Sequence, residues 1–177
     1  MKFAILVCSL FFSAMTHAKE LETVPYVDLG RYAGVWYQIA HKPLFFEGGT
    51  CPCARQVLTP RQDGVIGVYN SCNSEKPGGE IREIRGVAIN DNPKTNARFT
   101  VDFNLPFKGS YWIIGLDPEY RFAVVSDKYK YSLYILAKEP TLSAELYGKA
   151  LELASRQLDL GGLEVTLQKG CSYPSTK

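Results

Sequence analysis

Four cysteines are the residues of this chain best suited, by type and number, to do chemistry. They are Cys51, Cys53, Cys72 and Cys171. They follow an N-terminal segment typical of exported proteins, and an even number of cysteines in an exported chain predicts disulfides. Asp63-Gly64 marks a hairpin turn between two strand-like runs. Folding the chain about that turn brings Cys53 opposite Cys72. Cys51 is then left to hold the C-terminal tail through Cys171.

Two other kinds of cysteine chemistry are disfavoured. A zinc site is the first alternative, but Cys51-Pro52-Cys53 does not have the usual spacing of zinc ligands. The two histidines are His17, inside the N-terminal segment, and His41. A catalytic thiol is the second alternative, and it needs an unpaired cysteine, whereas all four can pair. We therefore predict no metal and no cofactor.

Other catalytic groups are equally sparse. A Ser-His-Asp set is disfavoured because His41 is the one histidine that follows the N-terminal segment. We interpret Asp102, Asp117 and Glu119 as solvated or turn carboxylates rather than as an acid/base pair. The formal net charge is +2, and the absence of a dense Lys/Arg run gives no support to a nucleic-acid partner. The sequence favours a binding protein over an enzyme.

The N-terminus has the layout of a secretory signal peptide. A positive charge at Lys2 precedes an apolar run over residues 3–12 and small residues up to Ala18. We place cleavage after Ala18, so that residues 1–18 are the signal peptide and residues 19–177 form a single domain. The mature protein is expected to be soluble in the periplasm or outside the cell. Cys8 lies inside the apolar run, so we do not expect it to be a lipid anchor.

Eight strand-like runs occupy most of the mature chain. The clearest covers residues 97–103, where apolar residues alternate with polar ones, as in a half-buried strand. The other runs are placed at residues 34–41, 53–59, 65–72, 80–89, 110–116, 120–126 and 131–137. Eight short strands joined by tight turns fit an up-and-down β-barrel or a sandwich.

The hydrophobic period changes near residue 140. Spacings of three and four then define one face of a helix, formed by Leu142, Leu146, Ala150, Leu151 and Ala154. Thr141 or Ser143 can cap its start, and Gly161-Gly162 ends the segment. A short ninth strand is predicted over residues 163–167. A single helical turn is predicted earlier, at residues 28–32.

Three motifs in order add a family resemblance. Gly34-Val35-Trp36-Tyr37 begins the first predicted strand, Asp117 and Tyr120 lie in the turn after the sixth, and Lys138 ends the eighth. The chain therefore resembles the lipocalins, in particular the bacterial lipocalin and apolipoprotein D branch, over about residues 26–173. The first motif matches the family's G-x-W-Y. The second stands where the family has its Thr-Asp-Tyr turn, enlarged here by Pro118-Glu119, and Lys138 replaces the Arg that usually lies over the Trp ring.

The resemblance implies a fold and a disulfide. The fold is an all-β, eight-stranded antiparallel up-and-down β-barrel with one C-terminal α-helix and a short ninth strand. Trp36 would fill the closed end after a close approach of the chain at Gly34. Lys138 can make a cation–π contact with Trp36 but lacks the flat guanidinium of an Arg. The family's disulfide from the first loop to the C-terminal tail maps onto Cys51 and Cys171.

Alternate residues of each strand face the interior of such a barrel. If Trp36 faces in, so do Gln38 and Ala40. For the second and third strands we choose the inward set Gln56, Leu58, Gly67 and Tyr69, and a shift of one residue would swap it. The residues that we predict to bind a ligand are Gln38, Tyr69, Ile84, Val101, Phe103, Tyr111, Ile113, Ser132 and Tyr134, with Phe45 and Phe46 in a loop folded over the barrel mouth.

That lining is apolar and aromatic, with a few polar groups, and it suits an elongated apolar ligand with one polar end. The resemblance implies a fatty acid or a lysophospholipid. The alternative is an envelope-stress or partner-binding module that acts through its surface, with the barrel as scaffold. Tyr129 and Tyr131, beside Lys128 and Lys130, would then contact a membrane surface or a partner, unless they are simply a solvated hairpin tip. We expect a monomer or a weak homodimer.

Overall fold

The computed structural model describes residues 20–43 and 51–175. The predicted signal peptide, with Cys8, and the loop that contains Phe45 and Phe46 lie outside the described residues. Neither helix within the described residues is long and apolar enough to cross a membrane.

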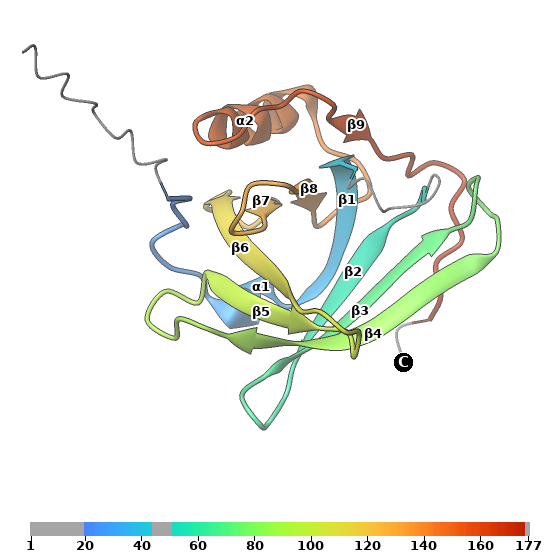
Figure 1. The fold of residues 1–177 in the computed structure, drawn as a ribbon. Coiled ribbons are helices and arrows are strands. Elements are labelled where there is room, and N and C mark those ends of the chain that lie inside the picture. Colours follow the sequence, from blue (N-terminus) through green and yellow to red (C-terminus); the bar gives the residue numbers. More distant parts are fainter. Residues whose placement is uncertain (1–19, 44–50, 176–177) are drawn as a thin grey trace, which may run out of the picture.

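Eight antiparallel strands form a closed barrel (Figure 1). Each strand pairs with the next along the chain from β2 to β8, and β1 closes the barrel by pairing with both β8 and β2. The ninth strand, β9, pairs with the end of β1. The predicted barrel with one late helix and a ninth strand is therefore confirmed. In order the elements are α1 (Leu29–Tyr32), β1 (Gly34–Lys42), β2 (Arg55–Pro60), β3 (Ile66–Asn73), β4 (Ile81–Asn90), β5 (Arg98–Asp102), β6 (Gly109–Leu116), β7 (Phe122–Ser126), β8 (Leu133–Ala137), α2 (Ala144–Ser155) and β9 (Glu164–Val165).

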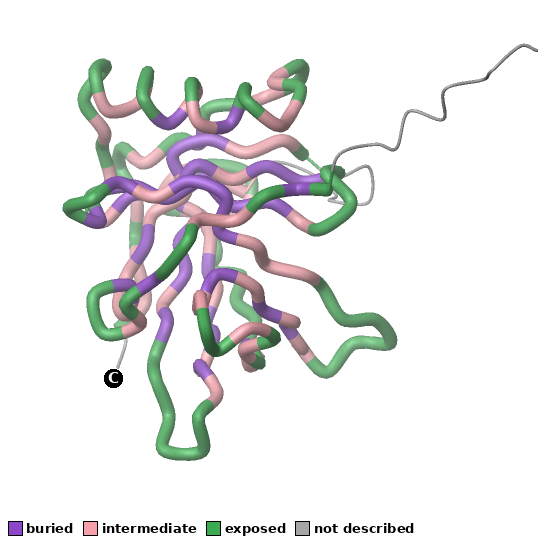
Figure 2. The backbone as a smooth tube through the Cα atoms, turned by 90° about the vertical axis from the view of Figure 1, so that its left-hand side faces the viewer, coloured by how far each residue is buried: buried purple, intermediate pink, exposed green. Residues whose placement is uncertain are grey.

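Helix α2 packs on the outside of the barrel. Ser143 is its N-cap, and its hydroxyl accepts a hydrogen bond from the Leu146 N–H. Ala150 and Ala154 are fully buried in a core formed with outward side chains of β1, β6, β7 and β8. Figure 2 shows the resulting band of buried residues in the strands beneath the helix. The predicted apolar face of the helix is confirmed.

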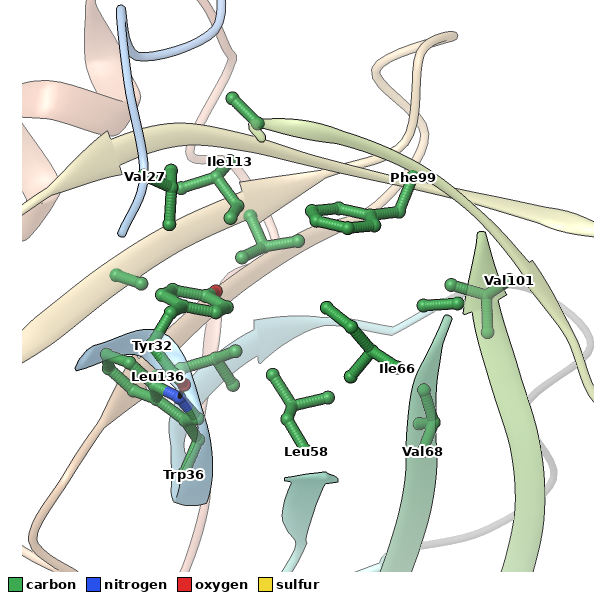
Figure 3. Close-up of a cluster of buried hydrophobic side chains, with 14 of the residues drawn as sticks. Val27, Tyr32, Trp36, Leu58, Ile66, Val68, Phe99, Val101, Ile113 and Leu136 are labelled. Carbon is green, nitrogen blue, oxygen red and sulfur yellow. Dashed lines mark hydrogen bonds between the residues drawn. The ribbon is translucent and has the colours of Figure 1, made fainter. Parts of the chain in front are cut away.

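The closed end of the barrel is built around Trp36. Its ring is fully buried, its Nε1 donates to the Tyr32 carbonyl at 2.7 Å, and its centroid lies 4.8 Å from that of Tyr32 (Figure 3). The Lys138 Nζ lies 4.2 Å from the Trp36 ring centroid and donates to the Ala33 carbonyl at 2.6 Å. Gly34 has a φ of +93°, a conformation that favours glycine. The predicted cation–π contact is present, with lysine in place of arginine.

The turn between β6 and β7 is held by a buried carboxylate. Asp117 accepts hydrogen bonds from Arg121 Nε at 2.7 Å and Nη2 at 2.8 Å, and from the backbone N–H groups of Glu119 and Arg121. The Tyr120 hydroxyl accepts from the Asp28 N–H at 2.8 Å. The Asp117–Tyr120 motif thus fixes the turn and ties it to the segment that leads into α1.

Replacing Asp117 by Asn should destabilise the protein by about 2 kcal/mol at neutral pH, because charged hydrogen bonds to a buried group are lost. The Arg121 guanidinium holds the pKa of Asp117 below its usual range. A lowered carboxyl pKa adds stability above the pKa of the unfolded chain, and this is lost as the pH falls through the folded pKa. The difference between wild type and Asp117→Asn should therefore shrink below about pH 4.

Urea unfolding at neutral and acidic pH measures this difference. Glu119→Gln is the matched control, since this exposed side chain is 3.9 Å from Arg31 and should contribute about 0.5 kcal/mol or less. Equal losses in the two variants would contradict the structural role of Asp117.

The disulfide pairing differs from the prediction. All four described cysteines are paired, but as Cys51–Cys72 and Cys53–Cys171. The predicted Cys53–Cys72 and Cys51–Cys171 bonds are therefore wrong. The observed register pairs Arg55 with Ser71, one residue away from the register that would set Cys53 opposite Cys72. The chain also turns away at Cys53, where φ is +59° and the N–H donates to the Leu167 carbonyl.

Candidate functional site

The candidate site is a cavity of about 950 Å³ inside the barrel. It begins beyond the buried Trp36 and reaches the opposite end of the barrel. There its lining includes Pro43, which follows β1, and Gly109, which begins β6. We call this the open end. Most of the wall is apolar, and its main contributors are Leu58, Ile66, Val68, Ala88, Phe99 and Leu136. A cavity of this size and character lies within the range of sites for lipids and drug-sized molecules.

Six of the predicted ligand-binding residues line the cavity. They are Gln38, Ile84, Val101, Phe103, Tyr111 and Tyr134. They come from β1, β4, β5, β6 and β8 and from the residue that follows β5, as expected from inward alternation around a barrel. Their contact with a ligand stays a prediction.

Three other predicted residues lie elsewhere. The Tyr69 hydroxyl donates to Glu83 at 2.6 Å, and its ring lies under the Arg85 guanidinium, outside the cavity lining. Ile113 is buried in the core around Trp36. Ser132 belongs to the turn between β7 and β8, where its hydroxyl donates to Asp127 at 2.7 Å.

The inward set chosen for β3 was therefore wrong by one residue. Ile66, Val68 and Asn70 face the cavity, whereas Gly67 and Tyr69 do not line it. On β2 the expected Gln56 and Leu58 do line the cavity. They pair with Asn70 and Val68 across the two strands, which places these four side chains on one face.

A β-bulge in β1 brings an unexpected residue into the site. The register with β8 shifts between Gln38 and Ala40, so Ala40 packs beneath α2 instead of facing in. His41 now lines the cavity, stacked on Tyr134 with the ring centroids 6.4 Å apart. The regular alternation of a strand gave no signal for this inward histidine.

The deep part of the cavity holds a small network of neutral polar groups. The Tyr32 and Tyr111 hydroxyls are hydrogen-bonded at 2.7 Å, and Gln56 Nε2 donates to the Tyr111 hydroxyl at 2.6 Å. Burial raises the pKa of Tyr111 to about 12 and that of Tyr32 well above its usual value. Both phenols therefore stay protonated at neutral pH, and their polar groups are satisfied by each other and by Gln56.

Polar groups that can still form hydrogen bonds lie nearer the open end of the cavity. His41 Nδ1 and Asn70 Oδ1 are buried and have no hydrogen-bond partner among the described residues. Gln38 Nε2, by contrast, donates to Thr166 Oγ1 at 2.9 Å. Arg82 is exposed and also belongs to the lining, with the inward face of β4. The site is an apolar chamber with a polar mouth, where Arg82 lies in the same lining as Glu75, Glu83 and Glu164.

Comparison with known proteins identifies the family. The model of the lipocalin-like domain matches residues 27–168. Temperature-induced lipocalin-1 of Arabidopsis thaliana is 31% identical, covering 87% of this chain and 86% of that protein. Outer membrane lipoprotein Blc of Escherichia coli K12 is 33% identical, covering 88% and 84%.

Apolipoprotein D proteins are also among the relatives, as the predicted branch requires. Among solved structures, insecticyanin from the tobacco hornworm Manduca sexta superposes with a TM-score of 0.68 at 19% identity, covering 89% of this chain and 90% of insecticyanin. The chain belongs to the lipocalin-like family. Its fold and relatives support the binding of a small hydrophobic molecule.

Proposed function

We propose that this protein binds and carries a fatty acid or a lysophospholipid, in the periplasm or outside the cell. The observation that carries the proposal is the apolar cavity of about 950 Å³ that ends in a polar mouth. Two disulfides fit an oxidising compartment. All four described cysteines are in these disulfides, so none supplies a thiol nucleophile for an enzyme.

The acyl chain would supply most of the binding free energy. Burying a methylene group stabilises a complex by about 0.8 kcal/mol, so ten methylenes contribute about 8 kcal/mol before the cost of association. The wall formed by residues such as Leu58, Val68 and Phe99 offers no strong hydrogen-bonding group to a chain. A chain of about sixteen methylenes would contribute about 13 kcal/mol, which leaves roughly 8 kcal/mol, a micromolar dissociation constant, after an association cost of about 5 kcal/mol.

The head group would remain at the mouth. Arg82 can attract a carboxylate or a phosphate, and the buried His41 Nδ1 and Asn70 Oδ1 can exchange hydrogen bonds with polar head-group atoms. A ligand in the opposite orientation would bury its charged head group among the neutral phenols of Tyr32 and Tyr111, at a large desolvation cost.

Native mass spectrometry of protein purified from its own cells should show a lipid-sized adduct. Titration of the delipidated protein with oleate should then give saturable binding, and Arg82→Gln should weaken it about threefold, as expected for an exposed ion pair. Binding of the uncharged monoolein should be unchanged by this substitution.

Arg85→Gln is the matched control, because Arg85 lies on the same strand but stacks over Tyr69 outside the cavity lining. A clean apo mass together with no saturable binding of either lipid would contradict the proposed function. Equal weakening by the two arginine variants would contradict the proposed position of the head group.

A further inference from the structure

Exposed apolar side chains are distributed unevenly over the barrel. Among the described residues, ten large apolar side chains are exposed. Tyr26 and Ile89 lie toward the closed end, while the other eight lie at or near the open end. These eight are Ile81, Ile84, Leu105, Phe107, Tyr129, Tyr131, Val165 and Leu167. Ile84, Val165 and Leu167 belong to the cavity lining, and the other five side chains lie around the mouth of the cavity.

The most exposed part of this surface comes from two neighbouring hairpin tips. Leu105 and Phe107 lie between β5 and β6, and Tyr129 and Tyr131 lie between β7 and β8. We call these four residues the apolar rim. Phe107 is 63% exposed and Tyr131 is 71% exposed. A hydrogen bond from the Lys128 N–H to Ser110 Oγ, at 2.9 Å, connects the β7–β8 tip to the start of β6. Ser110 also lines the cavity.

The same tips carry a positive charge. Residues 102–108 and 127–132 contain three lysines, Lys108, Lys128 and Lys130, against two carboxylates. Asp102 pairs with Lys108 at 2.9 Å, so the net positive charge comes from the β7–β8 tip. Asp127 is turned toward its own hairpin, where it accepts from the Tyr129 N–H at 2.7 Å and from the Ser132 hydroxyl at 2.7 Å. Lys128 Nζ lies 4.8 Å from the Tyr129 ring centroid. Cations and exposed aromatic rings are thus presented together.

We propose that the open end docks on the surface of an anionic lipid membrane, with the apolar rim entering the head-group region. Tyrosine and other large apolar residues next to lysine form the composition that favours the boundary between lipid and water. The lysines would be attracted by anionic lipids, each adding to the affinity near the surface. The cavity mouth would then face the bilayer, and an acyl chain could pass between membrane and barrel with little exposure to water.

Co-sedimentation with vesicles tests this proposal on the purified protein. Binding to phosphatidylcholine vesicles should be weak and should rise when phosphatidylglycerol is included, and added salt should reduce it. Phe107→Ser/Tyr131→Ser should weaken binding to the anionic vesicles about tenfold or more. Lys128→Gln should weaken it about fivefold.

The matched control is Tyr26→Ser/Ile89→Ser, which removes exposed apolar side chains from the closed end and should leave vesicle binding unchanged. None of the exchanged rim residues lines the cavity, so titration with soluble oleate should give the same affinity in every variant. That titration separates a failure of docking from a failure of the proposed carrier function.

A second measurement does not depend on loss of binding. Phe107→Trp should show fluorescence quenching by vesicles with brominated acyl chains, whereas Ile89→Trp should show no added quenching. No vesicle binding, or equal binding by the rim and control variants, would overturn the proposal. So would concentration-dependent dimerisation that the rim variant abolishes in the absence of vesicle binding, because a second copy of the chain would then cover the rim.

Discussion

Val101→Trp should reduce the affinity for a long acyl chain by about a hundredfold. Val101 faces the cavity, and its neighbours across the two adjacent strands are Ala88 and Gly109, which leave room for an indole to extend into the chamber. Displacing three or four methylenes of the chain loses about 3 kcal/mol, which corresponds to that factor. The enlarged side chain should cost about 1 to 3 kcal/mol of stability through overpacking.

Calorimetric titration with oleate measures the loss of affinity, and thermal unfolding shows that the variant is folded. Ile89→Trp is the control, because Ile89 is exposed on the outward face of β4, next to the inward Ala88. It should bind oleate as wild type does. Undiminished binding by folded Val101→Trp would place the ligand outside the barrel.

The framework of this protein follows from short-range signals. The three motifs mark Trp36 and Lys138, which meet at the closed end, and the Asp117 turn. The change of hydrophobic period near residue 140 predicts α2 with its buried alanines. Each of these features depends on residues close together in sequence or on a motif with one structural role, so a linear pattern is sufficient to find it.

The errors in the site have a common physical origin in strand register. Placing the β2–β3 hairpin one residue out of register pairs Cys53 with Cys72 and turns Tyr69 inward at the same time. The observed pairing of Arg55 with Ser71 corrects both. Because side chains alternate with a period of two, a slip of one residue exchanges the two faces of a strand. Both faces of β3 carry apolar residues, so the pattern itself does not choose between them.

The inward position of His41 was missed for a related reason. A bulge in β1 puts Ile39 and Ala40 together on the face beneath α2 and returns His41 to the cavity. A bulge adds one residue to a strand and shifts the alternation of its side chains beyond that point. Strict alternation therefore predicts Gln38 correctly and fails two residues later.

Of the two disulfides, Cys53–Cys171 should contribute more to the stability of the folded protein. It joins residues 118 apart, and closing a loop of that length in the unfolded chain corresponds to about 5 kcal/mol on the chain-entropy account. It also holds the C-terminal tail, where Thr166 and Leu167 line the cavity. Cys53→Ser/Cys171→Ser should therefore lower both the unfolding free energy and the affinity for oleate.

Denaturant unfolding of Cys53→Ser/Cys171→Ser is compared with that of Cys51→Ser/Cys72→Ser, which opens a loop of 21 residues and should lose about 3 kcal/mol. The pairing itself is read from single variants by labelling free thiols. Cys53→Ser should expose a thiol at Cys171, and Cys51→Ser should expose one at Cys72. Labelling of Cys72 in Cys53→Ser would instead support the Cys53–Cys72 pairing expected from the hairpin. It would also support the one-residue register shift that turns Tyr69 into the cavity.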